Sequence, residues 1–164
     1  MKKRWIIVVD EYEGLKEKAI EIISGTVSGY VKYVLPTKRI DAISDDEIKK
    51  FNIITLGQIK DNRILQLCEK SGNLNVPCQQ EGYSIYVGAS PLDAESQIIA
   101  IAGYDDAGVL YGCIDFCNKY CGHTVYQRGD LFGENYFDEP FNVEMPSWKY
   151  SVSPAIKTRA IWTW

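Results

Sequence analysis

Three cysteines in a predicted helix have a spacing that would let their thiols act together. Cys113, Cys117 and Cys121 recur every four residues, so they share one stripe of the helix, and His123 follows closely. Zinc sites usually place two ligands about two to four residues apart on a turn, and C-x3-C-x3-C is not one of their patterns. The stripe also carries Leu110, and free cysteine is commonly buried. We interpret the stripe as a core face, with a thiol or metal site as the alternative.

The chain contains a single histidine, His123, so any catalytic dyad or triad that needs an imidazole depends on it. It directly follows Gly122, which is predicted to stop the helix. A histidine cation at the C-terminus of a helix is stabilised by the helix dipole. We therefore interpret His123 as a structural residue rather than a general base.

Two groups of carboxylates stand where a predicted strand gives way to a helix. Asp10, Glu11 and Glu13 follow the first strand, where ligand sites of α/β proteins lie and acid–base chemistry is possible. Acidic residues in the first turn of a helix are also simply stabilising, and we favour that interpretation. Asp105 and Asp106 precede another helix, and an Asp in that place is usually its N-cap. Neither group predicts an active site.

Apolar periodicity predicts the elements that position these residues. Gly25 and Gly29 are expected to end the first helix, and Pro36 to stop the second strand. The order of elements predicts an α/β (α+β) fold, with a small mixed β-sheet and helices mostly on one face. The predicted strands cover residues 5–9, 30–35, 51–56, 83–87 and 97–102. The predicted helices begin at Gly14, Ser44, Arg63 and either Asp105 or Asp106, and the helix from Arg63 is expected to run to Lys70, where Gly72 terminates it.

Composition excludes several classes of function. The net charge is -4 and no basic stripe is present, so we expect no nucleic-acid partner. No basic amphipathic helix favours a membrane surface, and the apolar run Trp5–Val9 is too short for a signal peptide, which predicts a cytoplasmic protein. An odd count of 5 cysteines favours reduced thiols. No glycine-rich phosphate loop is present, and we expect no cofactor or metal.

The chain divides into three segments by composition. Residues 1–122 hold the predicted α/β domain, and residues 123–153 form an aromatic arm that contains proline and has no sustained period. Residues 154–164 end in an apolar run with no turn after it. We expect this last segment to be the first strand of a following domain that the chain only begins.

Residues 82–112 read GYSIYVGASPLDAESQIIAIAGYDDAGVLYG, two strands followed by a helix. The helix opens with the pattern D-x-x-G-x-x-Y-G, on Asp105, Gly108, Tyr111 and Gly112. This arrangement resembles the small N-terminal α/β domain that precedes the catalytic barrel in β-N-acetylhexosaminidases and α-glucuronidases. The resemblance implies that Gly108 lets the helix lie close to the sheet and that Tyr111 covers the junction with the next domain.

The last segment, KTRAIWTW, is similar to the first barrel strand of the same enzymes, in which an arginine precedes a small residue. The resemblance implies that Arg159 reaches substrate hydroxyls in the complete enzyme; the alternative is a strand-end arginine that pairs with a neighbouring carboxylate. It also implies that Trp162 or Trp164 lines the sugar subsite, while the catalytic carboxylates lie on later barrel strands.

The resemblance therefore implies a non-catalytic N-terminal domain of a glycoside hydrolase. Its partner is a downstream (β/α)8 barrel in the same polypeptide, and a carbohydrate substrate meets the complete protein. The alternative is a self-contained binding or dimerisation module that uses the aromatic arm, residues 123–153, as its interface.

Overall fold

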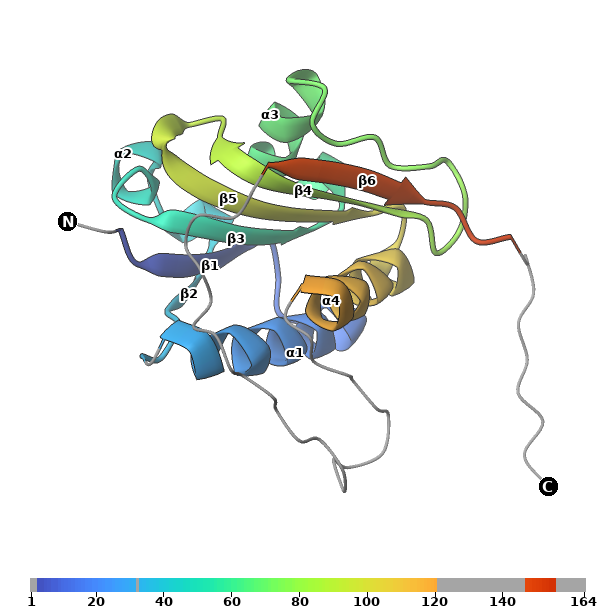
Figure 1. The fold of residues 1–164 in the computed structure, drawn as a ribbon, viewed down its shortest axis with the longest axis horizontal. Helices are drawn as coiled ribbons and strands as arrows, with labels where there is room; N and C mark the ends of the chain where they lie inside the picture. The colour runs from blue at the N-terminus through green and yellow to red at the C-terminus, as the bar shows by residue number, and fades with distance from the viewer. Residues whose placement is uncertain (1–2, 32, 121–146, 156–164) are drawn as a thin grey trace.

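The computed structural model describes residues 3–31, 33–120 and 147–155. Its strands form one mixed sheet in the order β2-β1-β3-β5-β4-β6. Neighbours among β2, β1, β3 and β5 run parallel, whereas β4 is antiparallel to β5 and β6 is antiparallel to β4 (Figure 1). The strands are β1 (Trp5–Val9), β2 (Thr37–Arg39), β3 (Asn52–Gly57), β4 (Tyr83–Ser90), β5 (Asp93–Gly103) and β6 (Trp148–Val152).

Helices cover both faces of the sheet, and the two long helices share one face (Figure 1). A hydrophobic core lies on each face of the sheet. Helices α1 (Gly14–Val31) and α4 (Asp106–Tyr120) pack against the core on one face, and α2 (Asp45–Ile48) and α3 (Arg63–Lys70) pack against the core on the other. Short 3-10 turns, η1 (Ile40–Ala42) and η2 (Ile59–Asp61), precede α2 and α3. The predicted α/β class, with a mixed sheet, is confirmed. Within the described ranges, no helix is long and apolar enough to cross a membrane.

The central strands explain why the sheet needs two layers of helices. Every residue of β1 and of β3 is buried, as expected for parallel strands covered on both faces. Side chains alternate between the faces, so Ile7 and Val9 join the core under α1 and α4, while Ile6 and Val8 join the core under α2 and α3.

The predicted strand over residues 30–35 is wrong, because α1 continues to Val31. Gly25 and Gly29 do not end the helix, since Val27 between them is fully buried against the sheet. Packing of that face outweighs the cost of glycine in a helix, which is about 1 kcal/mol per residue relative to alanine.

The strand that follows α1 starts later than expected. Leu35 is buried in extended chain, and the carbonyl of Pro36 accepts a hydrogen bond from the Ile7 N–H at 2.9 Å. Proline has no N–H to donate, so pairing of β2 with β1 starts at Thr37. Pro36 therefore precedes the strand instead of stopping it.

Capping residues and a glycine lie at the helix boundaries that the sequence predicts for α2, α3 and α4. Ser44 caps α2, because its hydroxyl accepts a hydrogen bond from the Glu47 N–H at 3.3 Å. Asp105 caps α4 by accepting from the Gly108 N–H at 2.8 Å. Gly72, with φ +70, follows the end of α3. These contacts confirm the predicted starts of α2 and α4 and the predicted end of α3.

Strand β6 lies inside the segment predicted to be an arm, residues 123–153. It pairs with β4 from Tyr83↔Val152 to Val87↔Trp148, so the sheet includes the end of that segment. The reason is alternation: Trp148, Tyr150 and Val152 pack against the core of α1 and α4, while the residues between them face the other way.

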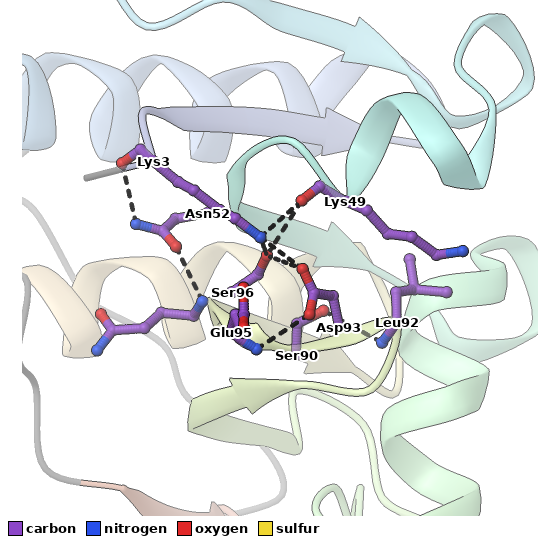
Figure 2. Close-up of polar contacts among 9 residues, drawn as sticks. Lys3, Lys49, Asn52, Ser90, Leu92, Asp93, Glu95 and Ser96 are labelled. Carbon is purple, nitrogen blue, oxygen red and sulfur yellow. Dashed lines mark hydrogen bonds and ion pairs between the residues drawn. The ribbon is translucent and has the colours of Figure 1, made fainter. Parts of the chain in front are cut away.

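The amino ends of β1, β3 and β5 are tied together by polar side chains (Figure 2). The Lys3 ammonium donates to the Asp93 carboxylate, to the Ser96 hydroxyl at 2.7 Å and to the Lys49 carbonyl at 2.8 Å. The Asn52 side chain donates to the Lys3 carbonyl at 3.2 Å and accepts from the Gln97 N–H at 2.9 Å. All three protons of the Lys3 ammonium are used here.

Candidate functional site

The carboxyl ends of β1, β3 and β5 form the opposite end of the sheet. The chain leaves β1 toward β2 and leaves β3 toward β4 and β5, so neighbouring strands send it in opposite directions. Ligands of open α/β sheets bind at such a switch point. Asp10 follows β1, Gln58 follows β3, and Asp106 begins α4 after β5.

Lys16, in the first turn of α1, lies at the centre of this end. Its side chain is 2% exposed, and its Nζ lies 2.6 Å from Asp10 Oδ2, 2.7 Å from Glu11 Oε1 and 3.7 Å from Asp106 Oδ1. Gln58 Nε2 donates to Asp106 Oδ1 at 2.8 Å. Burial alone would lower the pKa of Lys16, but the hydrogen bonds to Asp10 and Glu11 and the nearby charge of Asp106 raise it instead. We name these five residues the lysine cluster.

The lysine cluster is poorly suited to acid–base catalysis. Asp10 and Glu11 both accept a hydrogen bond from the one Lys16 ammonium, so one oxygen of each carboxylate is already engaged. Asp10 Oδ1 is buried and has no hydrogen-bond partner among the described residues. It is covered by Gly57, where a Cβ atom would lie 2.8 Å from it and where φ is +144. Glycine at position 57 therefore allows the end of β3 to lie directly against the Asp10 carboxylate.

All three carboxylates of the cluster were singled out from the sequence, but the reason predicted for Asp10 and Glu11 is wrong. Asp10 and Glu11 precede α1, so they do not lie in its first turn. Glu13 is exposed, and its backbone carbonyl accepts from the Lys16 N–H at 3.2 Å at the start of the helix. The missed residue is Lys16, whose sequence neighbours gave no sign that an ammonium would be buried.

The D-x-x-G-x-x-Y-G pattern has a packing role. Asp105 accepts from the N–H of Glu81, at 3.1 Å, as well as from Gly108. A Cβ atom on Gly108 would lie 2.4 Å from the Gly82 carbonyl oxygen, and one on Gly112 would lie 2.7 Å from the Ile101 side chain. Only glycine allows α4 this close to its neighbours: Gly112 makes the close approach to the sheet, whereas Gly108, for which that role was expected, lies against the loop before β4.

Large hydrophobic side chains are exposed around the lysine cluster. Tyr12 and Leu15 follow β1 and are 38% and 45% exposed, and Tyr104, directly after β5, is 46% exposed. Tyr111, in the second turn of α4, is 36% exposed. Among the residues that the structure describes, one other large hydrophobic side chain, Val34, is exposed. We call Tyr12, Leu15, Tyr104 and Tyr111 the tyrosine-rich end.

A second carboxylate fixes β6 to α4. The Asp115 carboxylate accepts from the hydroxyls of Tyr83, at 2.7 Å, and of Tyr150, and from the Lys119 ammonium at 3.2 Å. Burial, followed by these hydrogen bonds to Asp115, raises the pKa of both tyrosines. Burial opposes ionisation of Asp115, but the donated hydrogen bonds prevail and lower its pKa. Both phenols stay protonated, so this cluster is structural.

The cysteine stripe is part of the core where the structure describes it. Cys113 and Cys117 are fully buried, and burial raises the pKa of Cys117 to about 11 and that of Cys113 well above its usual value. In residues 3–31, 33–120 and 147–155, no group of three or more His, Cys, Asp or Glu side chains could hold a metal ion. Cys121 and His123 lie outside these ranges.

The predicted substrate-binding residues Arg159, Trp162 and Trp164 also lie outside the described residues. The structure shows instead a cavity of about 320 Å³ beside β6. We call it the β6 pocket; it is lined by Gly72, Asn73, Asn75, Ser84, Lys149, Tyr150 and Ser151. The sequence did not predict this pocket, because no motif was recognised in the α3–β4 loop and no strand was expected at residues 148–152.

Comparison with models of protein families gives no match, and comparison with curated protein sequences gives none either. The function of the chain must therefore be argued from the arrangement of its own residues.

Proposed function

We propose that this chain is a non-catalytic α/β domain of a larger glycoside hydrolase, and that it supports a catalytic (β/α)8 barrel by packing against it. The observation that carries the proposal is the tyrosine-rich end. Four of the five exposed large hydrophobic side chains among the described residues gather where β1 and β5 end and α1 and α4 begin. Large apolar side chains that stay exposed at one end of a fold are a feature of interaction surfaces.

The residue types suit a docking surface. Tyrosine offers a large apolar ring and a hydroxyl that can find a new partner, and it is enriched at protein interfaces. Tyr111 belongs both to the tyrosine-rich end and to the D-x-x-G-x-x-Y-G pattern. The pattern therefore sets the close packing of α4 and, in the same turns of helix, presents a ring outward.

Charge defines the kind of partner surface. Lys16 is buried, whereas the side chains of Glu11 and Asp106 are 47% and 42% exposed. The outer rim is therefore acidic although a lysine lies beneath it. A barrel surface that carries Arg or Lys between apolar residues would complement this rim.

The packing role is tested in the longer protein that the proposal implies. We expect Leu15→Ser with Tyr104→Ser to lower the midpoint of thermal unfolding of that longer protein, while leaving this chain by itself nearly unchanged. Val34→Ser is the matched control, because Val34 is 90% exposed and precedes β2, away from the tyrosine-rich end. Equal effects of the two changes on the longer protein would overturn the packing role.

The catalytic part of the proposal has its own test. The longer protein is expected to hydrolyse an aryl N-acetyl-β-glucosaminide or an aryl α-glucuronide, and this chain alone is expected to hydrolyse neither. Turnover by residues 1–164 would contradict a non-catalytic role. A stable dimer at micromolar concentration that Leu15→Ser with Tyr104→Ser dissociates would instead favour a self-contained dimerisation module.

A further inference from the structure

We propose that the β6 pocket binds a small polyhydroxylated molecule of the saccharide class. The proposal does not require the chain to belong to a glycoside hydrolase, and no residue of the pocket belongs to the tyrosine-rich end. It depends on the shape of the cavity, on the hydrogen-bonding groups around it and on the charge at its rim.

Three separate segments build the pocket. Gly72, Asn73 and Asn75 come from the α3–β4 loop, Ser84 comes from β4, and the remaining residues come from β6. The volume of about 320 Å³ is at the lower end of the range for small-molecule sites. Most such sites combine apolar surface with a few placed polar groups, and this one likewise offers amide, hydroxyl and ammonium groups beside apolar surface. The polar groups, rather than the lining as a whole, are therefore what would select a ligand.

The floor of the pocket is already held in place without a ligand. Ser84 is 1% exposed, and its hydroxyl accepts from the Asn75 N–H at 3.2 Å. The Ser151 hydroxyl lies 2.6 Å from the Asn75 carbonyl oxygen and 3.0 Å from Ser84 Oγ. These contacts connect β6 and β4 to the loop. A ligand therefore meets a preorganised surface and loses less free energy in ordering it.

The side chains above this floor have hydrogen-bonding capacity to spare. Within the described part of the chain, the side-chain amides of Asn73 and Asn75 have no hydrogen-bond partner, and Asn73 is half-buried. Each amide offers two donors and one acceptor. A sugar hydroxyl also donates and accepts, so neighbouring hydroxyls on one ring match both functions of an asparagine. This match is the chemical reason for the saccharide class.

Lys149 gives the pocket a preference for negative charge. Its ammonium donates to the Gly72 carbonyl at 2.7 Å, which leaves two protons for a ligand. The pocket lining contains no carboxylate. A ring that carries a carboxylate, such as glucuronate, should therefore bind more tightly than a neutral ring, because its negative charge is attracted by the positive charge of the ammonium in addition to the hydrogen bond.

The test is a titration of the ¹⁵N-labelled chain, followed by NMR, with glucuronate and with N-acetylglucosamine. We expect the side-chain amide signals of Asn73 and Asn75 and the backbone signal of Ser151 to shift with both sugars, and Kd to be about fivefold lower for glucuronate. Absence of shifts at these residues at high millimolar sugar, or small shifts scattered over the whole surface, would overturn the proposal.

Two variants with one control identify the groups responsible. Asn75→Ala keeps the backbone contacts to Ser84 and Ser151, and should weaken both sugars about fivefold, as expected for one lost hydrogen bond. Lys149→Met should weaken glucuronate and leave N-acetylglucosamine nearly unchanged. Gln80→Ala changes an exposed side chain of the same loop and should alter neither affinity. Equal effects of Asn75→Ala and Gln80→Ala would contradict the assigned site.

The spectra also separate this proposal from the docking role. Each variant must keep the dispersed spectrum of the native fold for its affinity to count. The Leu15→Ser and Tyr104→Ser variant should bind glucuronate as the native chain does. If the native chain does not bind either sugar, the proposed saccharide site is wrong. The packing role would then still be judged by its own experiment.

Discussion

The two ends of the sheet both place a lysine beside carboxylates, but they differ in how deeply the lysine is buried and in how many carboxylates surround it. At the amino end the side chains of Lys3 and Asp93 are 23% and 24% exposed, and one carboxylate shares the ammonium with a hydroxyl and a carbonyl. At the carboxyl end Lys16 is 2% exposed and has three carboxylates around it.

This difference separates a contact that holds strands in register from one that shapes a surface. The contacts of Lys3 are complete, and water competes with them, so they should add little to stability. Lys16 has lost its water, and removal of the ammonium would leave Asp10 charged and buried. The lysine cluster holds more carboxylates than ammonium groups, and the carboxylates of Glu11 and Asp106 are partly exposed to solvent. We therefore regard the carboxyl end as the one suited to recognition.

The largest expected effect is that of Lys16→Met. We expect a loss of about 3–5 kcal/mol in the free energy of unfolding, because the change leaves a buried carboxylate without its cation. Urea denaturation followed by circular dichroism measures it. Lys18→Met is the control, since Lys18 is 61% exposed in its ion pair with Glu21 and should cost at most about 0.5 kcal/mol. A loss below about 1 kcal/mol for Lys16→Met would remove the distinction between the two ends.

Gly57→Ala should have the next largest effect. The new Cβ would meet Asp10 Oδ1 at 2.8 Å, and φ of +144 disfavours a side chain, so we expect a loss of about 1–3 kcal/mol by the same measurement. Gly25→Ala offers a clean contrast. It lies within α1 with no atom within 4 Å of a new Cβ, and should stabilise the chain by about 0.5–1 kcal/mol. Destabilisation by both changes would mean that the carboxyl end is not specially crowded.

Lys3→Met should cost no more than about 1 kcal/mol, because the carboxylate that it leaves behind remains accessible to water. Equilibrium unfolding of this variant beside Lys16→Met compares the two ends directly. A loss as large as that of Lys16→Met would show that exposure does not distinguish them.

The smallest expected effect is a shift in one titration. The hydrogen bond from Lys3 holds the pKa of Asp93 below its usual value of 3.8, with a further contribution from the Glu95 N–H. A depressed pKa stabilises the fold above the unfolded value, and this contribution disappears as pH falls below about 4 through the folded value. Carboxyl ¹³C shifts should show Asp93 titrating below 3.8, and Lys3→Met should bring it back toward that value. An unchanged titration in the variant would exclude Lys3 as the cause.

Elements with local signals could be predicted from the sequence. The buried runs at residues 5–9 and 51–56 became β1 and β3, and the helix over residues 63–70 became α3 with the same bounds. In each case the signal and its cause lie within a few residues of each other. Asp105 behaves in the same way, because its carboxylate caps the helix that it precedes.

Features that depend on distant partners could not be predicted in this way. The helix passes Gly25 and Gly29 because Val27 packs on a sheet that local propensity does not describe. Lys16 is buried because α1 and α4 begin at the same end of the sheet, which brings Asp106 beside it. Residues 148–152 were assigned to an arm without a sustained period, because the strand that they pair with, β4, lies far away along the chain.

Strand β6 has a consequence for the order of folding. The contact between the Ser84 hydroxyl and the Tyr150 carbonyl spans 66 residues, whereas β4 and β5 form a hairpin with a short turn. Closing a long loop costs entropy before its contacts repay it, so the hairpin should form in the transition state and β6 should dock after it. Amide protons of β6 should then exchange through local opening, faster than those of β3, and a sugar bound beside β6 would slow that exchange.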